Sequence, residues 1–227
     1  MEFIRILLND LSLENNINED PIAYKQLANI GKSQLEMSLE YSNYIMKREK
    51  SFITDIFYNQ LIIKFKCICG YETFNFSKIF DIPILIGSDL CYKFEDLIMD
   101  NLKEDNINWV NKCDKCRKQN INHSKETKFI LLNNIILFSL QRFDRNNNIK
   151  NESNIIYKEI LDLNPFWDDS LLIGLIKHYG SIDFGHYLSF IKIKEIWYKF
   201  NDSIITKLEN FKKNSKSVCI FIYEKIK

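Results

Sequence analysis

The amino-acid sequence predicts an α+β fold in which helices come first and a sheet-rich body follows. Apolar residues over 2–14 recur at helical spacing. From residue 61 the pattern changes to the alternation of strands, and apolar runs bounded by loops then extend to the C-terminus. With only 6 glycines and 3 prolines, no stretch is typical of a linker. We therefore expect one α+β chain of 227 residues rather than two independent domains.

Three segments near the N-terminus favour helices. Residues 2–14 form the first, and the sequence NNINEDP over 15–21 then predicts a loop. Residues 23–48 are mixed in character and are expected to be helical in part. The sequence SFITDIF over 51–57 begins with serine, a residue that commonly caps helix N-termini, and predicts a short third helix.

The later segments favour strands, with one helical interruption. LIIKFKC over 61–67 and YETFNFSKIF over 71–80 are rich in apolar and aromatic residues and predict two strands. SDLCYKFEDLIMDNL over 88–102 returns to helical spacing, with Ser88 as the expected N-cap. Five further runs are typical of strands: 128–143, 171–180, 186–193, 196–200 and 217–225.

The charge balance and the N-terminus exclude several classes of protein. The 31 basic and 30 acidic side chains give a net charge of +1, without the basic excess that a nucleic-acid partner requires. The N-terminus lacks the basic region of a signal peptide and the long apolar run of a membrane span. We expect an intracellular protein, cytoplasmic or nuclear, that binds neither nucleic acid nor membrane and keeps its thiols reduced.

Four of the six cysteines form two close pairs. Cys67 and Cys69 make a C-x-C pair, and Cys113 and Cys116 make a C-x-x-C pair. Two pairs of thiolates on turns at strand ends can converge on one tetrahedral zinc ion, and the residues between the pairs would then form a folded insertion. With four protein ligands the ion has no position left for water, so the sequence predicts a structural zinc site.

The other candidate ligands and nucleophiles are less suited to these roles. His123 is an alternative zinc ligand, although the sequence around it resembles a solvated loop. Cys219 lies in a continuous apolar run and is expected in the core. Cys91 lies near the start of the predicted helix over 88–102, where a thiol pKa can be lowered. No Asn or Gln precedes it closely enough to hold an oxyanion, so packing is favoured there too.

A histidine and a downstream amide suggest part of a catalytic site. His186 opens one predicted strand and Asn201 follows the end of the next, so a hairpin can bring the two side chains together. An amide or carboxylate beside a histidine holds one ring nitrogen and leaves the other facing a nucleophile, as in the Cys-His-Asn sites of cysteine proteases. Either Asn201 or the adjacent Asp202 can fill this role.

The sequences HYGSIDFGHYLSF over 178–190 and WYKFNDS over 197–203 resemble the histidine box of the ubiquitin-specific proteases, the papain-like class of deubiquitinases. Other stretches agree with the same family: IILFSLQRFD, the KCICG and CDKC cysteine motifs, the final SVCIFIYEK and the early EFIRILLNDL. The resemblance implies a papain-like fold with a partial helical thumb over 1–60, zinc-bearing β fingers with a helical insertion over 61–130, and a palm sheet with the histidine box over 131–227.

The resemblance also implies roles for individual residues and a partner. His186 would be the general base, oriented by Asn201 or Asp202. Gly185 and Tyr187 would line the narrow channel for the terminal glycines of ubiquitin. His178 would lie nearby in a structural or tail-contacting role. The expected partner is ubiquitin or a ubiquitinated protein, and the expected reaction is cysteine-type isopeptide hydrolysis.

The family's nucleophile, a cysteine in a Gly-Asn-Thr-Cys-Tyr box, has no counterpart in these 227 residues. Three explanations are open: the chain is part of a longer enzyme, it is a non-catalytic ubiquitin-binding pseudo-deubiquitinase or scaffold, or another cysteine such as Cys91 serves. The cysteine pairs alone would also be compatible with a zinc-ribbon protein that binds nucleic acid. The near-neutral net charge of the chain argues against this hypothesis.

Overall fold

The computed structural model describes residues 2–23, 32–109, 112–119, 121–144, 146–163 and 168–226. The chain divides into two compact units. The histidine unit comprises Met1–Arg5, Phe80–Asn101 and Asn133–Lys227. The cysteine unit comprises Ile6–Ile79 and Leu102–Leu132.

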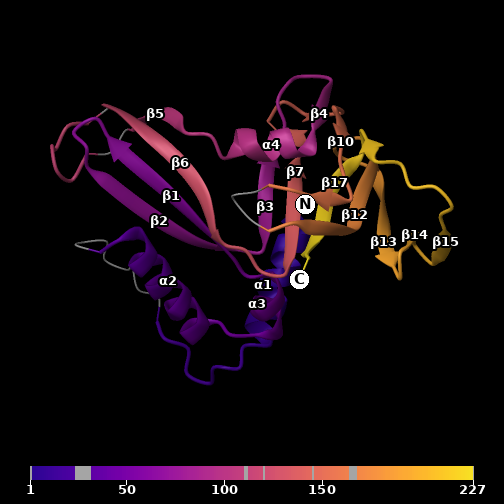
Figure 1. Cartoon of the computed structure of the whole chain (residues 1–227), viewed down its shortest axis with the longest axis horizontal. Helices are drawn as coiled ribbons and strands as arrows, with labels where there is room; N and C mark the ends of the chain where they lie inside the picture. The colour runs from indigo at the N-terminus through magenta and orange to yellow at the C-terminus, as the bar shows by residue number, and fades with distance from the viewer. Residues whose placement is uncertain are drawn as a thin grey trace. The chain divides into compact units, whose positions relative to one another are not determined.

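The cysteine unit combines helices with a four-stranded sheet. Its sheet has the order β2-β1-β6-β5, and all pairs in it are antiparallel (Figure 1). Helix α1 begins in the histidine unit and continues into this one. The bounds are α1 (Glu2–Glu14), α2 (Gln34–Arg48), α3 (Phe52–Phe57), β1 (Asn59–Cys67), β2 (Glu72–Ile79), β5 (Asp105–Trp109) and β6 (Ile121–Leu131). The helices expected over 2–14 and 51–57 are thus present, and part of 23–48 is helical.

Local capping explains where two of these helices start. Ser33 and Glu36 form a reciprocal capping box at α2, and Ser51 and Thr54 form one at α3. Helix α2 then packs against β2 through Tyr41, whose ring stacks on Phe76 with the centroids 5.6 Å apart. The expected serine cap at residue 51 is therefore confirmed.

The histidine unit is built on a large sheet with the strand order β15-β14-β13-β12-β17-β7-β3, and β11 pairs with β12 at its side (Figure 1). Two smaller sheets, β16-β10-β4 and β8-β9, complete it. The bounds are β3 (Asp81–Leu85), β4 (Cys91–Lys93), α4 (Phe94–Asn101), β7 (Ile135–Gln141), β8 (Phe143–Asp144), β9 (Ile149–Lys150), β10 (Asn154–Ile156), β11 (Ile160–Leu161), β12 (Ser170–Gly180), β13 (Gly185–Ile193), β14 (Ile196–Asn201), β15 (Ile204–Lys207), β16 (Asn214–Ser215) and β17 (Val218–Lys225).

An aromatic core fixes this sheet against α4. Phe94 of α4 packs edge-on against Phe138 of β7 and contacts Phe221 of β17, with ring centroids 5.3 and 4.3 Å apart. All three rings are fully buried. Burying an aromatic side chain removes a large apolar surface from water, so these contacts stabilise the sheet on which the histidines lie.

The run expected as one strand over 128–143 is interrupted, because β6 ends at Leu131 and β7 begins at Ile135. Two further sequence-based expectations about elements were wrong. The helix expected over 88–102 begins only at Phe94, because residues 91–93 form β4 and pair in parallel with β10, so Ser88 does not cap it and Cys91 lies in a strand. The loop expected around His123 is part of β6, where His123 lies opposite Cys67 and is buried. In both cases pairing with a distant strand overrides the local pattern.

Candidate functional site

The β13–β14 hairpin sets the position of the histidine site. Its two-residue turn consists of Lys194 and Glu195, both with positive φ of 47° and 65°, between the paired residues Ile193 and Ile196. A pair of positive φ angles is the signature of a type I′ turn, whose twist matches that of the flanking strands. The turn therefore fixes one register along the whole hairpin.

This register brings His186 and Asn201 together. The ladder ends at Ser189 opposite Phe200, so the next position places Leu188 opposite Asn201. His186 is two residues from Leu188 and shares its face of the sheet, within diagonal reach of Asn201. The His186 Nε2 and Asn201 Oδ1 atoms are 2.5 Å apart. Asp202 has a φ of 50° and lies outside β14, in the turn into β15.

The contact selects one tautomer of His186. An amide oxygen only accepts hydrogen bonds, so the Nε2 atom facing it carries the proton. In the neutral ring the lone pair then lies on Nδ1, the arrangement that a general base requires. The side chain of His186 is exposed, so Nδ1 is accessible to a reacting group.

The turn before His186 depends on two glycines. Gly180 has a φ of 113°, and a Cβ atom there would lie 2.4 Å from the carbonyl oxygen of Phe184. A Cβ atom on Gly185 would lie 2.0 Å from Nε2 of His178. The His178 ring thus occupies the space beside Gly185, and a side chain at either glycine would displace the turn that presents His186.

His178 is enclosed by two aromatic rings. The centroids of Phe143 and Tyr187 lie 5.2 and 4.6 Å from that of His178, which is 5% exposed. Burial and the nearby ammonium group of Lys150 lower the pKa of His178, so this ring stays neutral at physiological pH. The Nδ1 atom of His178 is buried without a hydrogen-bond partner.

A cavity of about 960 Å³ opens beside these rings. His178 and Tyr187 line it, together with Gly87, Arg142 and Ile149 among other residues. The Tyr187 side chain is 51% exposed, so part of its ring faces solvent. The structure therefore places His178, Gly185 and Tyr187 side by side, whereas His186 is not among the residues that line this cavity.

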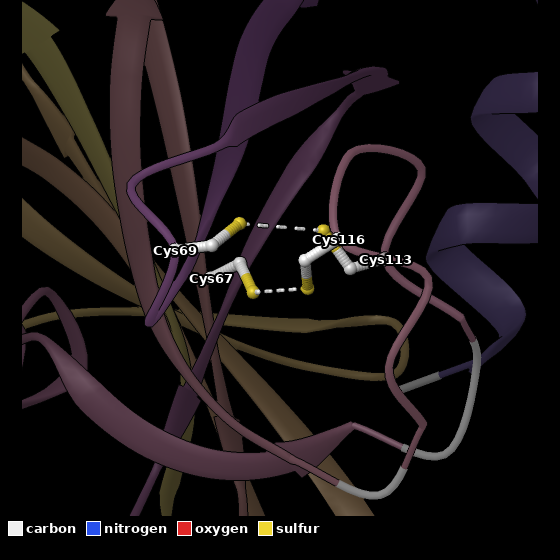
Figure 2. A group of neighbouring side chains, drawn as sticks. All are labelled: Cys67, Cys69, Cys113 and Cys116. Carbon is white, nitrogen blue, oxygen red and sulfur yellow. Dashed lines mark hydrogen bonds between the residues drawn. The ribbon is translucent and has the colours of Figure 1, made fainter.

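The four paired cysteines meet at one point of the cysteine unit (Figure 2). Their Sγ atoms all lie within 4.8 Å of one another. The Sγ atoms of Cys67 and Cys116 are 3.8 Å apart, and those of Cys69 and Cys113 are 3.7 Å apart. A tetrahedral zinc ion with Zn–S bonds of about 2.3 Å requires sulfur atoms about 3.8 Å apart. The cluster therefore fits a metal ion with four thiolate ligands.

Backbone turns present the two pairs. At the end of β1 the amide of Gly70 donates to the carbonyl oxygen of Cys67 at 2.8 Å, and Gly70 has a φ of 81° that glycine adopts readily. In the second turn the amide of Arg117 donates to the carbonyl oxygen of Cys113 at 2.8 Å. Backbone hydrogen bonds from Cys116 to the Cys113 sulfur lower the Cys113 thiol pKa to about 6, which favours the thiolate form that binds metal.

The remaining cysteine and histidine candidates lie outside this cluster. His123 faces Cys67 across the β1–β6 ladder, and the metal-binding group consists of the four cysteines alone. Cys219 is fully buried, its thiol donates to the carbonyl oxygen of Ile176 at 3.2 Å, and burial raises its pKa to about 11. Cys91 is exposed in β4. Neither thiol has the features of an activated nucleophile.

The sequence did not indicate two residues of the histidine site. Phe143 packs against His178, and Lys150 bonds to the carbonyl oxygens at the end of β12. Their spacing to the histidines follows no motif, and lysine is frequent in this chain. Only the pairing of Phe143 with Lys150 across β8 and β9 brings both side chains to the site.

Comparisons with known proteins find related sequences. A model of the ubiquitin carboxyl-terminal hydrolase family matches residues 1–223. The chain is 26% identical over 251 residues to ubiquitin carboxyl-terminal hydrolase 4 of Saccharomyces cerevisiae, a match that covers 92% of this chain and 27% of the relative. It is 27% identical over 253 residues to ubiquitin carboxyl-terminal hydrolase 21 of Bos taurus, covering 97% of this chain and 44% of that protein.

Solved structures share the fold. A chain of the yeast SAGA DUB module superposes with a TM-score of 0.76 at 19% identity, over 100% of this chain and 50% of that one. A chain of the SAGA DUB module bound to monoubiquitin gives a TM-score of 0.67 at 20% identity, over 86% of this chain and 47% of that one. The likeness confirms the predicted fold class, and this chain spans at most half the length of each of these four proteins. Among the described helices, none is both long and apolar enough to cross a membrane.

Proposed function

This chain belongs to the ubiquitin carboxyl-terminal hydrolase family, and from that premise we propose that its His186–Asn201 pair serves cysteine-type hydrolysis of the isopeptide bond at the C-terminus of ubiquitin. The observation that carries the proposal is the 2.5 Å contact between His186 Nε2 and Asn201 Oδ1. It puts the Nε2–H group on Asn201, so that in the neutral ring Nδ1 holds the lone pair and points away from the orienting partner, as a general base requires.

The roles follow from the chemistry of the two side chains. Nδ1 of His186 takes the proton of the attacking thiol and later gives it to the leaving amine. Asn201 is the positioning residue, because its amide oxygen holds the Nε2–H group and fixes the ring. We assign this role to Asn201 over Asp202 because the hairpin register sets the Asn201 side chain on the face of His186.

The substrate half of the proposal rests on the rings beside His186. Gly185, His178 and Tyr187 would border the path of the ubiquitin C-terminus, whose terminal glycines need a narrow passage. The close approach of His178 to Gly185, together with the half-exposed Tyr187 ring at the cavity, supports this assignment.

The thiol of the reaction is proposed to lie outside residues 1–227. Four of the six cysteines form the cluster, Cys219 is buried and bonded to a carbonyl oxygen, and Cys91 lies in β4 beside Asn154. These surroundings support our proposal that none of the six is the nucleophile.

Zinc is the metal that we propose for Cys67, Cys69, Cys113 and Cys116. Zinc prefers four thiolates in a tetrahedron, and the Sγ separations of 3.7 and 3.8 Å suit it. When bound, the ion supplies no chemistry to the reaction, since its four positions are filled by protein. It would join the end of β1 to the turn at Cys113–Cys116, and a reducing intracellular setting would keep the ligands as thiolates.

A second function is favoured by one specific observation. Four of the thiols belong to the metal cluster, Cys219 is buried and Cys91 is exposed in β4. This arrangement also favours a non-catalytic protein of the same fold that binds ubiquitin or ubiquitinated proteins. Binding of ubiquitin is common to both functions, and hydrolysis distinguishes them.

One set of measurements tests both functions. Calorimetry should detect binding of monoubiquitin by the chain and by its His186→Ala variant, because the imidazole is needed for proton transfer and not for the fold. Ubiquitin with a C-terminal thiol-reactive group should form no adduct with residues 1–227. The longest expressed form of the protein should hydrolyse ubiquitin conjugates, and His186→Ala should lower the rate by about 10²- to 10⁴-fold.

The outcomes separate the alternatives. Binding without hydrolysis in every expressed form would favour the non-catalytic function. An adduct on Cys91 would identify an unexpected nucleophile and contradict our assignment of the thiol. Absence of ubiquitin binding would contradict both functions.

A further inference from the structure

The turn that carries His186 has little packing of its own. Its residues Ser181, Asp183 and Phe184 are exposed, and Phe184 leaves 82% of its side chain in solvent. The bonds within the turn are local: the Phe184 amide donates to Oγ of Ser181 at 3.2 Å, and that hydroxyl donates back to the Phe184 carbonyl oxygen at 3.3 Å. A short exposed loop held only by such bonds opens readily, so its anchor must come from elsewhere.

The anchor is the ammonium group of Lys150. Its Nζ atom donates to the carbonyl oxygen of Gly180 at 2.6 Å and to that of His178 at 3.2 Å. These two carbonyls lie at the end of β12, at the residue with the positive φ of 113° and two residues before it. Hydrogen bonds from a charged donor are stronger than neutral ones, so one side chain holds both peptide groups.

Lys150 is itself fixed in place. Its backbone pairs with Phe143 across the β8–β9 ladder, and its side chain is only partly exposed. The Nζ atom lies 6.0 Å from the centroid of the Phe143 ring, which also contacts His178. The cation therefore has an aromatic neighbour as well as its two carbonyl acceptors.

The β12–β13 ladder transmits this anchor to His186. Gly180 pairs with Gly185, and Tyr179 pairs with His186 in the next position. The His186–Asn201 contact of 2.5 Å tolerates little displacement, so the first pair of the ladder must stay closed. Any movement of the Gly180 carbonyl reaches Gly185 directly and His186 one residue later.

We propose that Lys150 is a positioning residue for the histidine site, which it serves by holding the Gly180 and His178 carbonyls and so keeping His186 in contact with Asn201. This inference rests on the proposed function of the His186–Asn201 pair. Lys150 does not touch the reacting atoms, and its effect passes through the backbone of the turn.

The test uses the histidine ring protons of the chain, which contains only 3 histidines. In a ¹⁵N-labelled sample the Nε2–H signal of His186, identified by its loss in His186→Gln, reports the contact with Asn201. Lys150→Met should speed solvent exchange of this proton by about tenfold or more, because local opening controls its protection. Lys150→Arg should restore most of the protection, since a guanidinium also donates to two carbonyls.

A matched control comes from the other end of the same strand. Lys192 in β13 is also a partly buried ammonium group, and its Nζ atom lies 2.6 Å from a carboxylate oxygen of Glu195 and 3.5 Å from one of Glu159. Lys192→Met should leave the exchange of the His186 ring proton within about twofold of the unmodified chain, because the residue lies beyond the ladder positions near the turn.

The result that overturns the inference is distinct from failure of the proposed function. If Asn201→Ala releases the His186 ring proton and Lys150→Met does not, Lys150 has no positioning role and the proposed function stands. If Asn201→Ala has no effect, the pair itself is wrong. An equal effect of Lys192→Met, or global unfolding of Lys150→Met, would also overturn the inference, because Lys150 would then act on the whole unit.

Discussion

The histidine pair and the cysteine cluster are assembled in opposite ways. His186 and Asn201 are 15 residues apart and belong to one hairpin. In the cluster, Cys69 and Cys113, whose sulfur atoms are in contact, are 44 residues apart, and Cys67 and Cys116 are 49 residues apart. Backbone register places the histidine pair, with the type I′ turn at one end and the Lys150 anchor at the other. The cysteines lie on two separate turns, and a bound metal ion would be the link between them.

This difference predicts which perturbation each region resists. Removing a side chain from the histidine pair should leave its hairpin folded, because the backbone hydrogen bonds of the ladder remain. Removing a ligand from the cluster should loosen the ends of its strands, because the β1–β6 ladder reaches the first turn only at its last pair, Cys67 with His123. A substitution in the His186–Asn201 pair should therefore change catalysis without changing the fold. A substitution in the cysteine cluster should change metal binding and the fold together.

The largest expected effect is therefore loss of the metal. Cys113→Ser should reduce zinc from one equivalent to less than half and open the ends of β1 and β6, because structural zinc contributes about 10 kcal/mol of binding energy to folding. Metal analysis and amide hydrogen exchange measure the two consequences. Cys91→Ser is the matched control, since Cys91 is an exposed cysteine outside the cluster, and it should retain both zinc and protection.

A zinc content below half an equivalent in the unmodified chain would contradict the metal assignment. Removal of zinc by a chelator with no change in exchange at β1 would contradict the structural role instead.

The second effect acts on chemistry with the fold retained. In the longest form that hydrolyses ubiquitin conjugates, Asn201→Ala should lower kcat/KM by about 10²-fold, because the His186 ring loses its orienting acceptor. Asp202→Ala should change it by no more than about twofold, as for most exposed substitutions. Steady-state rates measure both variants. In a His186→Ala background, Asn201→Ala should have no further effect, because the two residues act as one unit.

Equal losses for the two variants would show that Asp202 shares the orienting role. A larger loss for Asp202→Ala would reverse the assignment.

The same contrast explains what the sequence predicted. The sequence predicted the hairpin that joins His186 to Asn201, and it predicted the two cysteine pairs. Both depend on short spacings between residues, which can be seen in the sequence. The N-cap expected at Ser88 was wrong because β4 pairs with β10, about 60 residues further along the chain, and a local pattern holds no information on such a partner.

The sequence also did not predict the side-chain contacts that depend on the β8–β9 ladder. Lys150 reaches carbonyls 28 and 30 residues away, and among 31 basic residues nothing distinguishes it in sequence. The choice between Asn201 and Asp202 needed the strand register, because the register brings Asn201 to His186 while Asp202 lies in the following turn, and the family resemblance allowed either.

A third, smaller effect compares one glycine from each region. Gly185→Ala should destabilise the histidine unit by about 3 kcal/mol, because a Cβ atom would lie 2.0 Å from His178 Nε2. Gly70→Ala in the cysteine unit meets nothing within 4 Å and should cost only about 1 kcal/mol, for the left-handed backbone at φ 81°. Denaturant unfolding followed by amide exchange in β12 and β1 measures the two values.

The double variant Gly185→Ala, His178→Ala sharpens this prediction. The imidazole accounts for part of the clash, so the loss caused by Gly185→Ala should be smaller when His178 is already alanine. Additive losses would place the strain elsewhere, at the Tyr179 carbonyl oxygen that lies 2.5 Å from the same Cβ position.

The smallest effect is a pH dependence confined to the histidine unit. Burial and the Lys150 ammonium lower the pKa of His178 in the folded state, so the unfolded chain binds the proton first as the pH falls below about 6.5. Stability should therefore be independent of this group above that pH and decrease as the pH falls toward the folded pKa, with a slope of at most about 1.4 kcal/mol per pH unit.

His178→Gln should remove this slope in β12 and β13, as measured by amide hydrogen exchange at several pH values. Lys150→Met should reduce it, because the folded pKa of His178 then rises toward its ordinary value. A slope that persists in His178→Gln would assign the proton uptake to another group and would leave burial of His178 without an electrostatic consequence.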